Sequence, residues 1–386
     1  MRRMQDFIRD KEAHALALLL FLVASVAGVV LYGIDRHVFL YFGDAASHIV
    51  KARQLIDSQH PGLESIGTIW LPLPHFLLVP FVFFDSLFYS GIAGPSLGIP
   101  CLIGVGVLLF SIVRRITGSS AIAFVSACLF GLNPNVIYMA LTPMNELTFF
   151  FFVTVGGYAF LRWREEEHGR WLLLCAAAVM LATLCRYEAW ILAVFVSIVI
   201  AGKGISDWKR IGRRGTIRML VIAVLSVTGI LIWLCWNMFE FGDALQFAPW
   251  KYRPGPADVH NPMGYRQEPV FITLTKAVLN MFGPVVLLAC AVGFARLKRV
   301  ITERRHLPLL VFFSLPALFM FAGILTDSVL IDQWWWNWRF VLTFGLFLSV
   351  AGGIGLSEFF SRVRSRLARG VAVVALLIMP LVQLAV

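Results

Sequence analysis

Long apolar runs recur along the whole 386-residue sequence, and short clusters of charged residues separate them. A bilayer core needs about 20 apolar residues for each helical crossing, and fewer where helices pack inside protein. Hydrophobic residues make up 59% of the chain and charged residues only 14%, whereas soluble domains carry about 25% charged residues. This composition excludes a soluble, disordered, collagenous or disulfide-rich secreted protein. It predicts an all-α polytopic membrane protein.

The net charge of +11 does not indicate a nucleic-acid partner, because the basic residues are scattered between the apolar runs. That distribution is typical of membrane topology. The six cysteines lie in apolar runs without any CxxC pair, so the sequence indicates neither a disulfide framework nor a zinc site.

Eleven runs are candidate crossings, and a twelfth stretch, 71–90, is ambiguous. Its three prolines, with His75 and Asp85, suit an irregular or interfacial segment better than a spanning helix. The first run lacks a small-residue cleavage site, so we interpret it as a retained helix. The eleven candidates are 14–32, 95–113, 119–138, 146–161, 171–185, 187–202, 219–239, 277–294, 307–325, 338–356 and 371–386.

The distribution of Lys and Arg decides how the chain is oriented. If 71–90 does not cross and the N-terminus is cytoplasmic, 24 of the 33 basic residues lie inside. If 71–90 does cross, only 10 do. The positive-inside rule therefore favours about eleven crossings plus one non-crossing juxtamembrane segment. We expect a single integral membrane domain over 1–386 without a soluble domain at either end, and two long outer loops, 33–90 and 240–276.

The first outer loop contains an amphipathic segment that begins near Gly43. Asp44 and His48 stand four residues apart, on one face of a helix that would lie at the outer membrane surface. Asp44 is equally well interpreted as the helix N-cap or as a catalytic carboxylate. With His48 it also forms an incomplete ligand set for a divalent metal, so metal dependence stays open.

Two further residues mark the membrane boundary of the first half of the chain. His75 lies in the proline-rich stretch after the first loop, where broken backbone must line a cavity or be buried in protein; an interfacial histidine without a role is the alternative. Glu146 begins a strongly apolar helix, where the helix dipole favours a carboxylate. Its closeness to hydrocarbon also indicates that it faces a polar cavity.

Charged residues also mark three outer segments further along the chain. Arg186 and Glu188 share a very short turn, where they pair with each other or serve a site. Lys251 and Arg253 belong to the 240–276 loop, which is either a mobile lid or an inert loop. Arg339 follows a tryptophan cluster typical of an aromatic belt, and its guanidinium suits a lipid phosphate.

In this order the motifs resemble the GT-C superfamily of polyprenyl-phosphate-sugar-dependent glycosyltransferases, which includes protein O-mannosyltransferases and lipid A aminoarabinose transferases. The resemblance is carried by Asp44 in GDAASH, the segment WLPLPH with His75, and Glu146 in PMNE. RYEAW (186–190) and WRF (338–340) are similar to the arginine-bearing turns of bacterial and archaeal members. Many relatives have a paired acidic motif where Asp44 stands between Gly43 and Ala45, and this departure weakens the metal interpretation.

The resemblance implies a GT-C-like fold and transfer of a sugar from a polyprenyl-phosphate donor to an acceptor hydroxyl, with inversion, on the non-cytoplasmic face. It implies Asp44 as general base and Arg339, helped by Arg186 or Lys251, as the group that stabilises the leaving phosphate. The acceptor would be a glycan, a lipid or a protein, positioned by the remaining site residues. No cofactor beyond the open metal is implied, and the expected location is a prokaryotic cytoplasmic membrane.

Two other classes remain as alternatives. A transporter or flippase of lipid-linked sugars would also place charges in a membrane cavity, but such proteins are usually built from repeats, and none is visible here. A glycan polymerase or ligase would share the large outer loops and the arginines. The sequence does not identify the sugar, the acceptor, the polyprenyl length or the oligomeric state.

Overall fold

The computed structural model describes residues 11–248, 268–283 and 306–362, with the exception of 327, 330 and 332–336. The described residues form helices and no strand. The all-α fold class is therefore confirmed. In chain order the helices are α2 (Lys11–Ile34), η1 (Val38–Leu40), α3 (Gly43–Gln54), η2 (Leu63–Ile66), α4 (Leu73–Val82), α5 (Asp85–Tyr89), α6 (Ala93–Thr117), α7 (Ser120–Gly131), α8 (Pro134–Leu141), α9 (Glu146–Glu166), α10 (Gly169–Thr183), α11 (Glu188–Ser206), α12 (Trp208–Phe241), Val270–Gly283, α14 (Leu307–Leu325), η4 (Trp338–Thr343) and α15 (Phe344–Arg362).

Six of the described helices are long and apolar enough to cross a membrane: α2, α6, α11, α12, α14 and the segment that contains α15. The apolar run 119–138 is broken into α7 and α8, which meet at 60° and would make a seventh span if they cross together. Asn133 causes the break, because its side chain accepts hydrogen bonds from the backbone N–H groups of Asn135 and Val136 and so starts a new helix at Pro134. The count of eleven crossings stays a prediction, since 284–305 and 363–386 lie outside the described residues.

The stretch 71–90 forms two short helices, α4 and α5, separated by a break at Phe83 and Phe84. The ten residues of α4 span about 15 Å, roughly half of a bilayer core. This length agrees with a segment that does not cross. Arg53 of α3 fixes both helices, because its guanidinium donates to the carbonyl oxygen of Val82 at 2.7 Å and pairs with Asp85 at 2.7 Å.

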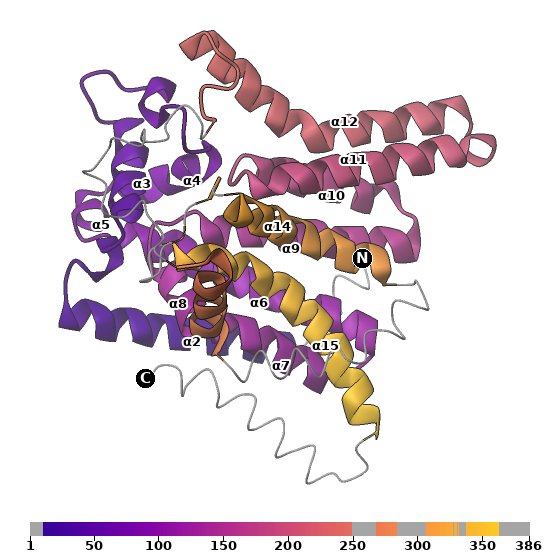
Figure 1. The fold of residues 1–386 in the computed structure, drawn as a ribbon, viewed down its shortest axis with the longest axis horizontal. Helices are drawn as coiled ribbons and strands as arrows, with labels where there is room; N and C mark the ends of the chain where they lie inside the picture. The colour runs from indigo at the N-terminus through magenta and orange to yellow at the C-terminus, as the bar shows by residue number, and fades with distance from the viewer. Residues whose placement is uncertain are drawn as a thin grey trace.

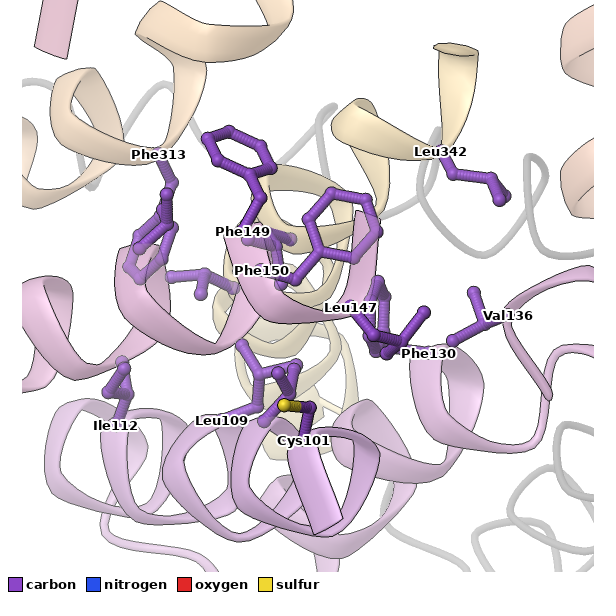
Figure 2. Close-up of a cluster of buried hydrophobic side chains, with 14 of the residues drawn as sticks. Cys101, Leu109, Ile112, Phe130, Val136, Leu147, Phe149, Phe150, Phe313 and Leu342 are labelled. Atoms are coloured by element: carbon purple, nitrogen blue, oxygen red, sulfur yellow. The ribbon is translucent and has the colours of Figure 1, made fainter. Parts of the chain in front are cut away.

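The long helices pack side by side, while α3, α4 and α5 gather at one end of them (Figure 1). Helix α6 lies at the centre and contacts α2, α7, α8 and α9. Side chains of α6 such as Cys101 and Leu109 meet Leu147 and Phe150 of α9 in the buried core, as Figure 2 shows. The core thus holds the first turn of α9 in place, and with it Glu146.

Close backbone contact between α6 and α8 depends on glycine. A Cβ atom at Gly98 would lie 2.2 Å from the carbonyl oxygen of Ala140, and one at Gly94 would lie 2.6 Å from the backbone nitrogen of Pro143. Small residues allow membrane helices to approach in this way. The contact positions the 142–145 turn that leads into α9.

Candidate active site

Five charged side chains from four separate segments meet at the end of the bundle where α3 lies. Asp44 is in the first turn of α3, Glu146 is the first residue of α9, and Arg339 lies in η4. Arg186 lies in the short connection between α10 and α11, and Glu188 is the first residue of α11. All five are residues that the sequence singled out.

These residues form a continuous carboxylate–guanidinium chain. Arg339 donates to Asp44 and, through Nε, to Oε1 of Glu146 at 3.2 Å. The same Oε1 accepts a hydrogen bond from Nη1 of Arg186 at 2.9 Å. Arg186 in turn binds Oε1 of Glu188 through Nε at 2.9 Å and Nη2 at 2.7 Å. Three carboxylates therefore share two guanidinium groups, with Glu146 at the centre.

Most of this chain is buried, and Asp44 is its exposed end. The side chains of Arg339, Glu146 and Glu188 are 5%, 3% and 5% exposed, whereas that of Asp44 is 39% exposed. Buried charges are tolerated only when they are paired and hydrogen-bonded. Burial alone would lower the pKa of the Arg186 guanidinium, but the carboxylates of Glu188 and Glu146 raise it above its usual range. Asp44 is the member that an approaching substrate can reach.

Asp44 does not cap its helix. The N-cap of α3 is Phe42, which makes no side-chain capping bond, and the Asp44 carboxylate is used by Arg339. Between the two interpretations left open by the sequence, the geometry therefore favours a carboxylate that belongs to a site. Glu146 likewise does more than interact favourably with the dipole of its helix, because its Oε1 accepts hydrogen bonds from both arginines.

Two oxygen atoms at the start of α9 have no hydrogen-bond partner within the described part of the chain. They are Oε2 of Glu146 and Oδ1 of Asn145, and both atoms are buried. Buried acceptors without partners are uncommon and costly. They are therefore available to the hydroxyl or amino groups of a bound molecule.

Aromatic rings lie against both arginines, and one of them also lines an apolar cavity. The guanidinium carbons of Arg186 and Arg339 lie 5.3 and 4.9 Å from the ring centre of Phe340, and Arg339 also lies 5.1 Å from that of Phe42. Such contacts stabilise cations through the ring quadrupole. Next to Arg339 opens a cavity of about 370 Å³, here called the Arg339 cavity. It is lined by Tyr41, Phe42, Asn135, Tyr138, Met139, Met281, Arg339 and Leu342.

The two predicted histidines, His48 of α3 and His75 of α4, lie next to each other. Nδ1 of His48 lies 2.9 Å from Nε2 of His75, and the His48 ring centre lies 4.7 Å from that of Trp70. His48 is 2% exposed and His75 is fully buried. The sequence suggested a role for each residue but not their pairing, which depends on α4 packing against α3.

Hydrogen bonds tie the first outer loop to the arginine turn. The hydroxyl of Tyr187 donates to the carbonyl oxygen of Ile69 at 2.9 Å, and the backbone N–H of Leu73 donates to the carbonyl oxygen of Leu184 at 3.0 Å. Thr68 and Asn237 join the same loop to the end of α12 at 2.5 Å. These bonds fix α3 and the 184–188 turn relative to each other.

Several site residues were not predicted from the sequence. They are Asn145, whose Oδ1 is buried without a partner among the described residues, and the aromatic residues Tyr41, Phe42 and Tyr138, which line the Arg339 cavity. Closeness in sequence to a predicted carboxylate is a signal that could have found Tyr41 and Phe42, which precede Asp44, and Asn145, which precedes Glu146. Lys251 and Arg253, by contrast, were predicted but lie outside the described residues.

Within the described residues, no group of three His, Cys, Asp or Glu side chains is placed to hold a metal ion. Asp44 and His48 share a helix face, but Nδ1 of His48 is occupied by His75 and Asp44 by Arg339. A metal held by Asp44 and His48 stays a prediction.

A structure comparison settles the fold. The crystal structure of ArnT from Cupriavidus metallidurans in the apo state superposes with a TM-score of 0.55 and 17% sequence identity, over 92% of this chain and 61% of that one. This chain has the GT-C fold. It spans less than two thirds of the length of its structural relative.

A sequence comparison agrees with the GT-C fold. The profile of the dolichyl-phosphate-mannose-protein mannosyltransferase family matches residues 98–233, which include Glu146, Arg186 and Glu188 but neither Asp44 nor Arg339. A search of curated proteins returns no match. The GT-C resemblance that the motifs indicated is confirmed by the two matches.

Proposed function

We propose that this protein is a membrane glycosyltransferase that moves a sugar from a polyprenyl-phosphate donor to an acceptor hydroxyl. One observation carries the proposal: a buried guanidinium, Arg339, lies at the wall of an apolar cavity and is bonded to a partly exposed carboxylate, Asp44. A cation beside an apolar cavity suits a lipid phosphate, and a carboxylate beside that cation suits a base. The similarity to mannosyltransferases and to ArnT supports the same reaction class.

The Arg339 cavity would hold the phosphate end of the donor. Phosphate oxygens bind guanidinium groups bidentately, while Phe42, Tyr138 and Leu342 provide apolar surface for the first isoprene units. Arg186 is linked to Arg339 through the Glu146 carboxylate and would add positive electrostatic potential at the phosphate. Lys251 and Arg253 remain candidates for the same role.

Asp44 would act as the general base. The acceptor oxygen attacks the anomeric carbon, its proton passes to the Asp44 carboxylate, and the bond between the anomeric carbon and the phosphate oxygen breaks. The electron pair leaves with the polyprenyl phosphate, whose added charge Arg339 stabilises. A single displacement inverts the anomeric centre. A phosphate bound to Arg339 would also compete with Asp44 for that guanidinium and so free the carboxylate for the acceptor.

The proposal places the site at the outer face of a prokaryotic cytoplasmic membrane, with the N-terminus inside. Helix α9 supports this orientation, because it begins with Glu146 in the site and ends about 30 Å away. At that far end Arg115 pairs with Glu165, and Arg210 with Glu167. The predicted cytoplasmic clusters that contain Arg115 and Arg210 therefore lie at the opposite end of the bundle from the site.

The test is sugar transfer by purified protein, with a panel of radiolabelled polyprenyl-phosphate sugars as donors and membrane extract as acceptor. We expect the wild type to transfer label, Asp44→Asn to bind donor without transfer, and Asp57→Asn to match the wild type. Asp57 is the matched control, because it is an exposed aspartate just beyond α3 that pairs with Arg53.

Full activity of Asp44→Asn would exclude Asp44 as the base. If the wild type binds donor but releases no label, the proposed reaction is wrong. A liposome flipping assay would then test the transporter alternative.

A further inference from the structure

The paired histidines lie beside Asp44 but outside the carboxylate–guanidinium chain. Besides its 2.9 Å contact with His48, His75 lies 3.1 Å through Nδ1 from the carbonyl oxygen of Leu71. Leu71, His75 and His48 thus form a hydrogen-bonded series that ends at Nε2 of His48. Among the described residues, none hydrogen-bonds to that last nitrogen.

This series determines which nitrogen of each ring carries the proton. A carbonyl oxygen only accepts, so Nδ1 of His75 must be the donor, which leaves its Nε2 as the acceptor in a neutral ring. Nδ1 of His48 must then donate to His75. Nε2 of His48 is therefore an unprotonated nitrogen whose lone pair none of the described residues uses.

The surroundings keep both rings neutral. Burial lowers the pKa of His75 to about 4, with a smaller contribution from Lys51. Burial, the His75 ring and the cations Arg339, Arg186 and Lys51 hold the pKa of His48 well below its usual value. Asp44, on the same helix, is paired with Arg339. A neutral ring still accepts a hydrogen bond at its unprotonated nitrogen.

The order of groups along α3 shows which substrate His48 would meet. Tyr41 and Phe42, just before the helix, line the Arg339 cavity. Asp44 follows in the first turn and His48 one turn later, beside the Trp70 ring. His48 therefore lies beyond Asp44 from the cavity assigned to the donor, and an aromatic ring next to a polar acceptor suits a hydroxyl-bearing carbon skeleton.

We propose that Nε2 of His48 accepts a hydrogen bond from a hydroxyl of the acceptor substrate, and that His75 is a positioning residue that fixes the tautomer of His48. This inference rests on the proposed function and adds to it an acceptor subsite formed by His48 and Trp70. The acceptor would be a polyol, such as a sugar, with one hydroxyl on Asp44 and a neighbouring hydroxyl on His48.

Paired substitutions separate this role from a structural one. His48→Asn keeps an N–H near the Nδ1 position for His75 but loses the acceptor at Nε2, whereas His48→Gln places an amide oxygen near Nε2. His75→Gln keeps an acceptor for His48, and His75→Leu removes it. Each variant is assayed for donor binding and for sugar transfer to membrane extract. The amount of extract is varied and is expressed as its total lipid concentration.

We expect His48→Asn to raise the half-saturating extract concentration about tenfold, the loss of one hydrogen bond, while donor affinity is unchanged. His48→Gln should recover most of this loss, and His75→Leu should resemble His48→Asn more closely than His75→Gln does. Unchanged half-saturation in His48→Asn would overturn the proposal. So would equal losses of donor and acceptor affinity in both His48 variants.

The tautomers are tested independently of activity by ¹⁵N NMR of histidine-labelled protein. The spectra of His48→Asn and His75→Gln, each of which lacks the signals of one ring, assign the resonances. We expect the proton on Nδ1 of both rings at neutral pH, and a proton on Nε2 of His48 would refute the positioning role. A wild type that transfers no sugar would refute the proposed function and the acceptor role with it. The NMR result still decides the His48–His75 geometry in that case.

Discussion

Acidification should destabilise this protein through His75, and the size of the effect follows from the burial of that ring. An unfolded histidine titrates near pH 6.5, whereas in the folded protein burial lowers the pKa of His75 to about 4. The unfolded state therefore binds more protons in this interval, so stability falls as the pH drops from about 6.5 towards 4. His75 lies in α4, which is too short to span the membrane.

Integrating that difference gives a loss of about 2 kcal/mol between pH 7 and pH 5. His48 adds to the loss in the same direction, because its pKa is also lowered by burial. The free energy of unfolding is measured by SDS titration in mixed micelles at each pH, followed by circular dichroism.

His75→Gln is the comparison, since every other titrating group is shared between the two proteins. We expect the wild type to lose about 2 kcal/mol more than His75→Gln between pH 7 and pH 5, and the two to have similar stability at pH 8. Identical pH dependence in the two proteins would refute the reasoning. A wild type that gains stability on acidification would refute it as well.

Three other substitutions test the packing and the charges of the site. Gly98→Ala should cost about 1–3 kcal/mol of unfolding free energy, because its Cβ would clash with the Ala140 carbonyl; Gly33→Ala, with nothing within 4 Å, is the control. Arg339→Lys should weaken donor binding about tenfold by removing bidentate contacts, and an unchanged Kd would contradict the phosphate assignment. Arg186→Met should cost about 3–5 kcal/mol in the same unfolding assay by leaving Glu146 and Glu188 buried without it, whereas Arg210→Met, in an exposed pair, should cost less than about 1 kcal/mol.

Hydropathy and helix signals predicted most of the described helices. The run 307–325 coincides with α14, and the helical spacing after Gly43 corresponds to α3. The run 119–138 was predicted as one crossing because a hydropathy average passes over Asn133 and Pro134. Those two residues carry a helix-start signal strong enough to turn the chain by 60°.

The site was predictable in its residue types but not in its contacts. Motif order selected Asp44, Glu146 and Arg339, yet whether Asp44 caps its helix or bonds an arginine depends on where the fold places Arg339 of η4. The histidine pair was likewise hidden, because α4 is held against α3 by Arg53, through the Val82 carbonyl and the Asp85 carboxylate. Such contacts are set by tertiary structure and leave no local pattern.

The bond between Asp44 and Arg339 joins residues 295 positions apart. During synthesis the N-terminal segments emerge first, so Asp44, the proposed general base, is present long before its arginine partner. The proposed donor site therefore cannot be completed until η4 has been made and Arg339 has reached Asp44. A partly synthesised chain would be unable to consume lipid-linked sugar, and catalytic competence would arise only with the late helices.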